Sequence, residues 1–166
     1  VADEELAVFN DVFCEVGVFT PEQSERILLA GKELGLVPKI HADEIESYGG
    51  AELAAKVGAI SAEHLLKASD EGVRLMAEAG VIACLLPATA LYLREEAAQG
   101  RAMIDAGVAV AISTDCNPGS SPTTSMPLVM NLACISMRLT PAEALVAATM
   151  NGACAIGMEE KVGSIE

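Results

Sequence analysis

Residues 8–41 form the stretch of sequence that decides the fold, VFNDVFCEVGVFTPEQSERILLAGKELGLVPKIH. The run Val8–Glu15 has the length and apolar content of a buried strand, and Val37–His41 repeats that pattern. Between the two runs, Thr20-Pro21-Glu22-Gln23 is a capping box with proline at the first helical position, and Gly35 is a typical helix stop. The order strand, helix, strand predicts a parallel βαβ unit.

The same alternation continues along the rest of the chain. Three more apolar runs are predicted strands, at Val57–Ser61, Val81–Pro87 and Val108–Thr114. Helices are predicted between and after them, at Tyr48–Lys56, 69–80, Leu91–Ala106, Met126–Arg138 and 140–156. The strands start at residues 8, 37, 57, 81 and 108, so the gaps are 29, 20, 24 and 27 residues, which is the repeat length of a βα unit. Such units build either a doubly wound open sheet or a (β/α)8 barrel, and a barrel requires eight of them. No Gly-x-Gly-x-x-Gly or Walker loop follows any of the runs.

The amino-acid composition limits the binding partners and the cellular setting that can be expected for this chain. The 166 residues include 24 acidic and 10 basic side chains, a net charge of −14, which argues against nucleic acid and anionic membranes. Hydrophobic residues make up 52% of the chain and aromatic ones only 3%, so we expect a folded, aliphatic core. No apolar run approaches the roughly 20 residues that span a bilayer. The five cysteines form no CxxC pair and predict a reducing, cytoplasmic setting, with Cys116 as the one candidate nucleophile.

Chemistry-bearing side chains gather where three predicted strands end. His41 and His64 are the only histidines of the chain, and Asp115 follows the last predicted strand. The carboxyl ends of parallel strands form the active face of βα proteins, so these three side chains favour one shared site over three separate structural roles. Imidazole and carboxylate suit a divalent metal, whose catalytic sites usually have three protein ligands. Either His64 is the third ligand, or further ligands lie elsewhere.

Three segments carry a resemblance to a known family: residues 39–44 (KIHADE), 62–65 (AEHL) and 113–120 (STDCNPGS). They resemble the amidohydrolase superfamily of metal-dependent hydrolases, and within it the members that open an imidazolone ring in histidine degradation. Residues 149–157 resemble the helix that follows the last barrel strand of these enzymes. The family carries a His-x-His pair at the end of its first strand, and this sequence has none.

The resemblance implies an α/β fold, a partial TIM (β/α)8 barrel made of strands four to eight with their helices. Residues 1–157 would form this C-terminal part of the barrel, and residues 158–166 would start the return to a small β domain. Strands one to three, the His-x-His pair, a cation for the substrate propionate and most of the β domain would be missing. The start at Val1 rather than Met agrees with a piece of a longer protein.

The resemblance also implies a role for each site residue. His41 and Asp115 would be ligands of one divalent metal ion, zinc or iron. His64 would be catalytic, polarising the ring carbonyl and stabilising the oxyanion. Asp115 would also be catalytic, accepting a proton from water and passing it to the leaving nitrogen. Glu44 would act in catalysis and in substrate binding by hydrogen-bonding the ring nitrogens. The remaining substrate-binding residues implied by the resemblance are Asn117, Gly119 and Ser120.

The implied reaction is the hydrolysis of a cyclic amide, in which 4-imidazolone-5-propanoate and water give N-formimino-L-glutamate. The expected partners are this small-molecule substrate and, for the parent protein, a homodimer as a candidate assembly, with no nucleic acid and no membrane. Two alternatives stay open: another amidohydrolase, such as a nucleobase deaminase, and a non-catalytic βα module. For two neighbouring residues a structural role is favoured: Asp43 as a helix N-cap, and Glu63 facing solvent or pairing locally. The isolated chain is expected to be inactive, with its first strand an exposed edge.

Overall fold

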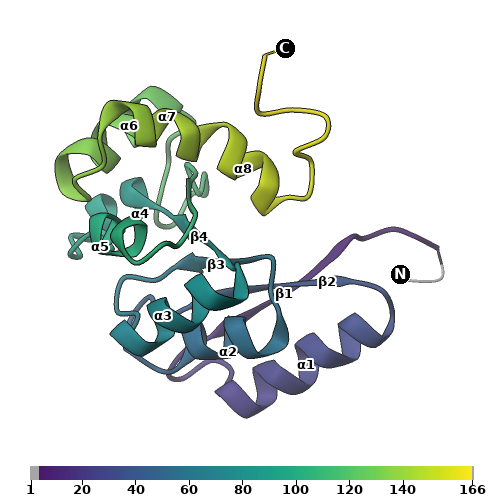
Figure 1. Cartoon of the computed structure of the whole chain (residues 1–166). Helices are drawn as coiled ribbons and strands as arrows, with labels where there is room; N and C mark the ends of the chain where they lie inside the picture. Colours follow the sequence, from purple (N-terminus) through teal and green to yellow (C-terminus); the bar gives the residue numbers. More distant parts are fainter. Residues whose placement is uncertain (1–3, 166) are drawn as a thin grey trace. The chain divides into compact units, whose positions relative to one another are not determined.

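The computed structural model describes residues 4–165, and the chain divides into two compact units, residues 1–81 and 82–166 (Figure 1). Each unit alternates strands with helices, as the sequence predicts. Among the described residues, no helix is long and apolar enough to cross a membrane. The five cysteines are all free thiols.

The first unit is a parallel sheet with helices packed against it. Its elements are β1 (Phe9–Cys14), α1 (Pro21–Glu33), β2 (Val37–Ala42), α2 (Gly50–Val57), β3 (Ser61–His64) and α3 (Asp70–Ala79). Strand β2 lies between β1 and β3, and α2 packs between α1 and α3 (Figure 1). The register pairs Phe13 with His41, and His41 with Glu63. The carboxyl ends of β2 and β3 therefore lie side by side, because Ala42 pairs with His64.

Local caps explain where the helices of this unit begin and end. The predicted capping box is confirmed, since the Thr20 hydroxyl accepts a hydrogen bond from the Gln23 N–H and the Gln23 side chain accepts one from the Thr20 N–H. Ser69 caps α3 in the same way by accepting from the Gly72 N–H. Gly80 ends α3 in the left-handed conformation, as expected for a C-terminal glycine.

The prediction of a strand at 57–61 is wrong. Val57 is the last residue of α2, and Gly58 caps that helix with a φ of 67°. Leu53, Ala54 and Val57 are all buried at helical spacing, which explains the apolar pattern without a strand. The true strand, Ser61–His64, begins four residues later and buries all four of its residues, three of them polar. The apolar-run criterion fails here because this strand is buried on both faces although its sequence is mostly polar.

The second unit contains a pair of parallel strands and five helices within the described residues. Its elements are β4 (Ile82–Leu85), α4 (Pro87–Leu93), α5 (Gly100–Asp105), β5 (Val110–Ile112), α6 (Met126–Ser136), α7 (Pro141–Ala148) and α8 (Met150–Ala155). The register of the strand pair matches Ala83 with Val110 and Leu85 with Ile112. After α8 the described chain has no further helix or strand, with turns and bends at residues 156–157 and 159–163.

Two predicted helices of this unit are broken in the structure. The one expected at 91–106 divides into α4 and α5, because Arg94 adopts a φ of 61° and caps α4. The one expected at 140–156 divides into α7 and α8 at Thr149, whose hydroxyl donates a hydrogen bond back to the Leu145 carbonyl at 2.7 Å. Such back-bonding by threonine competes with the regular helix ladder.

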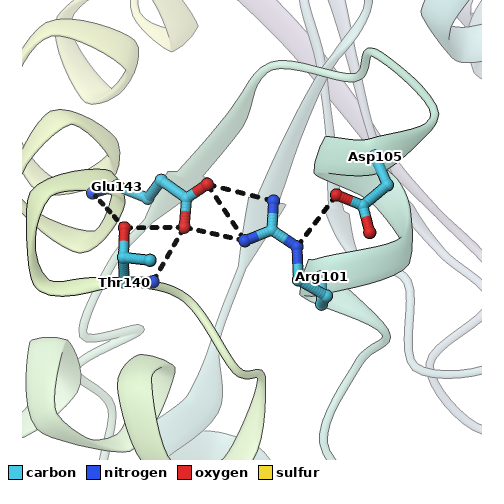
Figure 2. Close-up of polar contacts among 4 residues, drawn as sticks. All are labelled: Arg101, Asp105, Thr140 and Glu143. Atoms are coloured by element: carbon cyan, nitrogen blue, oxygen red, sulfur yellow. Dashed lines mark hydrogen bonds and ion pairs between the residues drawn. The ribbon is translucent and has the colours of Figure 1, made fainter.

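An ion-pair cluster connects α5 with α7 (Figure 2). The Arg101 guanidinium donates two hydrogen bonds to Glu143 Oε1, both at 3.0 Å, and one to Oε2 at 2.8 Å. Glu143 also completes the capping box of α7, since Oε2 accepts from the Thr140 N–H at 2.7 Å. These contacts hold the pKa of the Glu143 carboxyl at about 2, chiefly through the hydrogen bond from Arg101.

Candidate active site

Two histidines meet at the carboxyl ends of adjacent strands in the first unit. The His41 and His64 ring centroids lie 5.3 Å apart, with the rings tilted by 47°. His41 is the penultimate residue of β2, and His64 is the last residue of β3. The backbone turns sharply there, since His64 and Leu65 have φ values of 73° and 57°. His64 is only 4% exposed, so its ring is held in a defined position at this end of the sheet.

Two carboxylates, those of Asp11 and Glu63, lie near the His41 ring. His41 Nδ1 lies 2.9 Å from Asp11 Oδ2 and 3.1 Å from Asp11 Oδ1. Glu63 pairs with His41 in the sheet register, and one ligand atom from each of Asp11, His41 and Glu63 lies within 4.8 Å of the others. This is a donor set of one imidazole and two carboxylates, which are ligands that zinc and iron accept.

Glu63 is buried rather than facing solvent, which corrects one half of its sequence-based prediction. It is 7% exposed and forms an ion pair with Lys39 Nζ at 2.7 Å. The other half is confirmed, because the hydroxyl of nearby Ser61 donates to Glu63 Oε1 at 2.5 Å. The Lys39 ammonium also donates to the Ser61 hydroxyl. Lys39 neutralises a carboxylate that would be costly to bury alone.

Glu44 lies in the loop after β2, and its side chain reaches the second histidine. Glu44 Oε1 is 3.5 Å from His64 Nδ1. The preceding residue, Asp43, is not the N-cap of α2 as predicted, since that position is Gly49. Its carboxylate nevertheless binds the start of the helix from the preceding loop: Oδ1 accepts from the Tyr48, Gly49 and Gly50 N–H groups, and Oδ2 accepts from Ala51. Burial raises the pKa of the Asp43 carboxyl, and these N–H donors partly offset the shift.

Asp115 belongs to the second unit, in the loop after β5. Its φ is 49°, and its Oδ2 accepts a hydrogen bond of 2.7 Å from the Thr89 hydroxyl at the start of α4. A carboxylate so oriented presents a fixed oxygen and suits either metal binding or proton transfer. The backbone around Asp115 is fixed as well, because its carbonyl accepts from Asn117 Nδ2 at 2.8 Å.

Asn117 organises the rest of this loop. Its Oδ1 accepts from the Gly119 N–H at 2.9 Å and from the Ser120 N–H at 2.8 Å, which is an Asx-type turn. The Ser120 hydroxyl also contacts both side-chain polar atoms of Asn117. The Asn117 side chain is therefore engaged inside the loop and sets the conformation of the two residues that follow it.

The structure brings the predicted site residues together in two groups. The first unit holds His41, Glu44 and His64, and the second unit holds Asp115, Asn117, Gly119 and Ser120. Sequence reasoning missed Asp11, which has one local signal: a carboxylate beside Asn10 in the middle of the predicted strand run Val8–Glu15. Thr89 gives no such signal, because only the fold brings it to Asp115.

Comparison with known proteins defines the class. Residues 19–166 match the Amidohydrolase family, so the chain belongs to that family. A solved adenosine deaminase from Xanthomonas campestris with bound zinc is 26% identical, with a TM-score of 0.74 over 90% of this chain and 39% of that one. A solved amidohydrolase superposes with a TM-score of 0.78 over 99% of this chain and 46% of that one, at 23% identity. The predicted fold class is confirmed: the chain is part of an amidohydrolase TIM barrel.

Curated relatives point to one member of that class. The chain is 70% identical to the imidazolonepropionase of Brevibacillus brevis, over all of this chain and 39% of that protein. It is 58% identical to the imidazolonepropionase of Bacteroides thetaiotaomicron, over all of this chain and 40% of that protein. The chain thus spans about two fifths of the length of these relatives.

Proposed function

We propose that the protein to which this chain belongs is an imidazolonepropionase. It would hydrolyse 4-imidazolone-5-propanoate to N-formimino-L-glutamate in histidine degradation. The observation that carries the proposal is the packing of His41, His64 and Glu44 at the ends of β2 and β3, which supplies groups for binding and polarising a cyclic amide. The relatives at 58–70% identity support this substrate over other rings.

The residues fit a divalent metal, and we assign His41 and Asp115 as its ligands. The support for His41 is its place among imidazole and carboxylate donors, with ligand atoms of Asp11 and Glu63 within 4.8 Å. The support for Asp115 is its oriented carboxylate beside Thr89 and the family resemblance of its loop. When bound, such an ion makes water nucleophilic near neutral pH and polarises a carbonyl. The solved Xanthomonas campestris relative with bound zinc supports zinc, and iron stays the alternative.

His64 and Glu44 would act on the substrate ring itself. With Nδ1 of His64 beside the Glu44 carboxylate, we assign the contact with the ring carbonyl oxygen to Nε2. That hydrogen bond strengthens as negative charge grows on the oxygen during attack by water. The Glu44 carboxylate would accept hydrogen bonds from the ring N–H groups and so fix the orientation of the amide.

Asp115 would move the proton. As the water oxygen bonds to the carbonyl carbon, the water proton passes to an Asp115 oxygen. As the C–N bond breaks, Asp115 returns the proton to the leaving nitrogen. The Thr89 hydroxyl would hold Oδ2 in place for both transfers. Gly119 and Ser120 would line the pocket, on a turn whose shape Asn117 sets.

The remaining assignments concern the setting of the enzyme. We propose residues 1–157 as the C-terminal part of the barrel and residues 158–166 as the start of the return to a small β domain. A homodimer is the proposed assembly, and a small molecule rather than nucleic acid or membrane is the proposed partner. Five free thiols support a cytoplasmic location.

A chimera tests the proposed function. These 166 residues would replace the matching segment of the Brevibacillus brevis relative, and the purified, metal-loaded chimera would be assayed on 4-imidazolone-5-propanoate, cytosine, guanine and adenosine. We expect turnover of the imidazolone alone. Turnover of adenosine or a nucleobase would favour a deaminase, which the likeness to the Xanthomonas campestris enzyme makes the second candidate. Turnover of none of them would favour a non-catalytic module.

A further inference from the structure

One buried carboxylate of the first unit has no part in the chemistry above. Glu15 directly follows β1 and is only 1% exposed. Its Oε1 accepts a hydrogen bond from the Val16 N–H at 2.8 Å. Its Oε2 accepts from the N–H groups of Glu44 at 3.0 Å and of Ile45 at 2.8 Å. Three backbone donors from two loops therefore converge on a single side chain.

The energetics make this contact a strong connection between the two loops. A buried carboxylate is costly unless hydrogen bonds replace its water, and bonds to a charged acceptor are roughly twice as strong as neutral ones. The two consecutive N–H groups on Oε2 fix the peptide planes on either side of the Glu44 α-carbon. Because the loop after β2 contains Glu44, the loop after β1 determines where the Glu44 backbone lies.

The Glu44 side chain extends from that fixed backbone to the second histidine. Its Oε1 lies 3.5 Å from His64 Nδ1, so the path from Glu15 to His64 passes through one residue. Asp43, the residue before Glu44, is held separately by the N-terminus of α2. Glu15 thus supplies a restraint that acts on the Glu44 backbone itself.

We infer that Glu15 is a positioning residue of the active site. It holds the Glu44 backbone so that the Glu44 carboxylate stays against His64 and can meet the ring N–H groups of a cyclic amide. The catalytic consequence rests on the proposed function, whereas the connection between the loops does not. Misplacing Glu44 by about 1 Å is enough to reduce catalysis by as much as 10²-fold.

The test uses the metal-loaded chimera with Glu15→Ala, Glu15→Gln, Glu44→Gln and the double variant Glu15→Ala/Glu44→Gln. Glu46→Gln is the matched control, since Glu46 is an exposed glutamate of the same loop. We expect Glu15→Ala to raise KM and to lower kcat/KM by about tenfold or more, with unchanged metal content. Glu15→Gln keeps one oxygen that can accept from the Glu44 and Ile45 N–H groups, so it should recover most of the loss.

The double variant separates positioning from general stability. If Glu15 acts through Glu44, adding Glu15→Ala to Glu44→Gln should change kcat/KM by less than about twofold. A merely structural role would give the same fold-loss in both backgrounds, and that result would overturn the inference. If Glu15→Ala fails to fold, Glu15→Asp with and without Glu44→Gln provides the same comparison, because it keeps the charge but is one methylene too short to hold the Glu44 and Ile45 N–H groups in the same way.

Amide hydrogen exchange tests the connection without any substrate. The N–H groups of Glu44 and Ile45 should exchange faster in Glu15→Ala and stay protected in Glu46→Gln. Unchanged exchange at both amides would overturn the inference. If the unmodified chimera does not hydrolyse the imidazolone, the proposed function fails while the exchange result still decides whether Glu15 holds the loop.

Discussion

Asp11 provides a quantitative test of the His41 environment. The structure places both Asp11 carboxylate oxygens within 3.1 Å of His41 Nδ1. A metal-binding histidine usually donates its second ring N–H to such an acceptor, which fixes the tautomer and the ring orientation. Asp11→Ala should therefore weaken divalent metal binding by the chimera, even if His41 itself is retained.

The structure also sets the size of the effect. Loss of such a partner typically weakens metal binding by about 10- to 100-fold. The side chains of His41 and Asp11 are 37% and 35% exposed, so water screens their interaction and can partly replace the lost acceptor. We therefore expect the lower end, about tenfold, which corresponds to about 1.4 kcal/mol of binding free energy. Asp11→Asn keeps an acceptor oxygen and should lose less.

The assay is zinc competition with a chromophoric chelator. Asp70→Asn, which alters an exposed carboxylate at the start of α3, is the control and should match the unmodified chimera. An affinity of Asp11→Ala within twofold of the control would refute the argument that Asp11 orients His41. Complete loss of the metal would show instead that Asp11 is itself a ligand.

Three further predictions address the chemistry, the fold and the isolated chain. His64→Gln in the chimera should lower kcat by about 10²–10³-fold with the metal content unchanged, and a parallel loss of metal would make His64 a ligand. The pKa of Glu143 is held at about 2, below its ordinary value of 4.5, so its pairing with Arg101 stabilises the fold above about pH 4.5. That contribution is lost as the pH falls from 4.5 towards 2, so the free energy of unfolding should depend less steeply on pH in this window in Glu143→Gln than in the unmodified chimera. Acid unfolding followed by circular dichroism measures this, and an equal pH dependence in the two proteins would contradict it. The purified 166-residue chain should not hydrolyse the imidazolone, because it has only two histidines and lacks the His-x-His pair of the family. Measurable hydrolysis would overturn that expectation.

Most of the secondary structure could be predicted from the sequence, because helix starts and stops are set by residues that lie next to one another in the chain. The helices predicted to start after residue 20, at 69 and at 140 begin at a capping box, a serine cap and a second capping box, and each of these signals acts within a few residues of sequence. The strand at 61–64 escaped prediction because its burial depends on its neighbours and its sequence is mostly polar. The division at Thr149 escaped because it depends on one side-chain hydrogen bond.

The candidate site likewise has residues that the local sequence reveals and contacts that only the fold creates. His41, His64 and Asp115 could be selected because polar side chains at strand ends are visible in a linear sequence. Their partners could not, because the contacts of Asp11 with His41 and of Thr89 with Asp115 span 30 and 26 residues. Such pairs depend on strand register and helix placement, which no local pattern encodes.

The metal content of the chimera tests the central claim most directly. Mass spectrometry would measure divalent metal per chain in the unmodified chimera and in His41→Ala and Asp115→Ala, together with hydrolysis of 4-imidazolone-5-propanoate. Our account predicts one zinc or iron ion per chain, lost together with hydrolysis in both variants. An unmodified chimera without stoichiometric metal, or variants that keep both the ion and the activity, would contradict it.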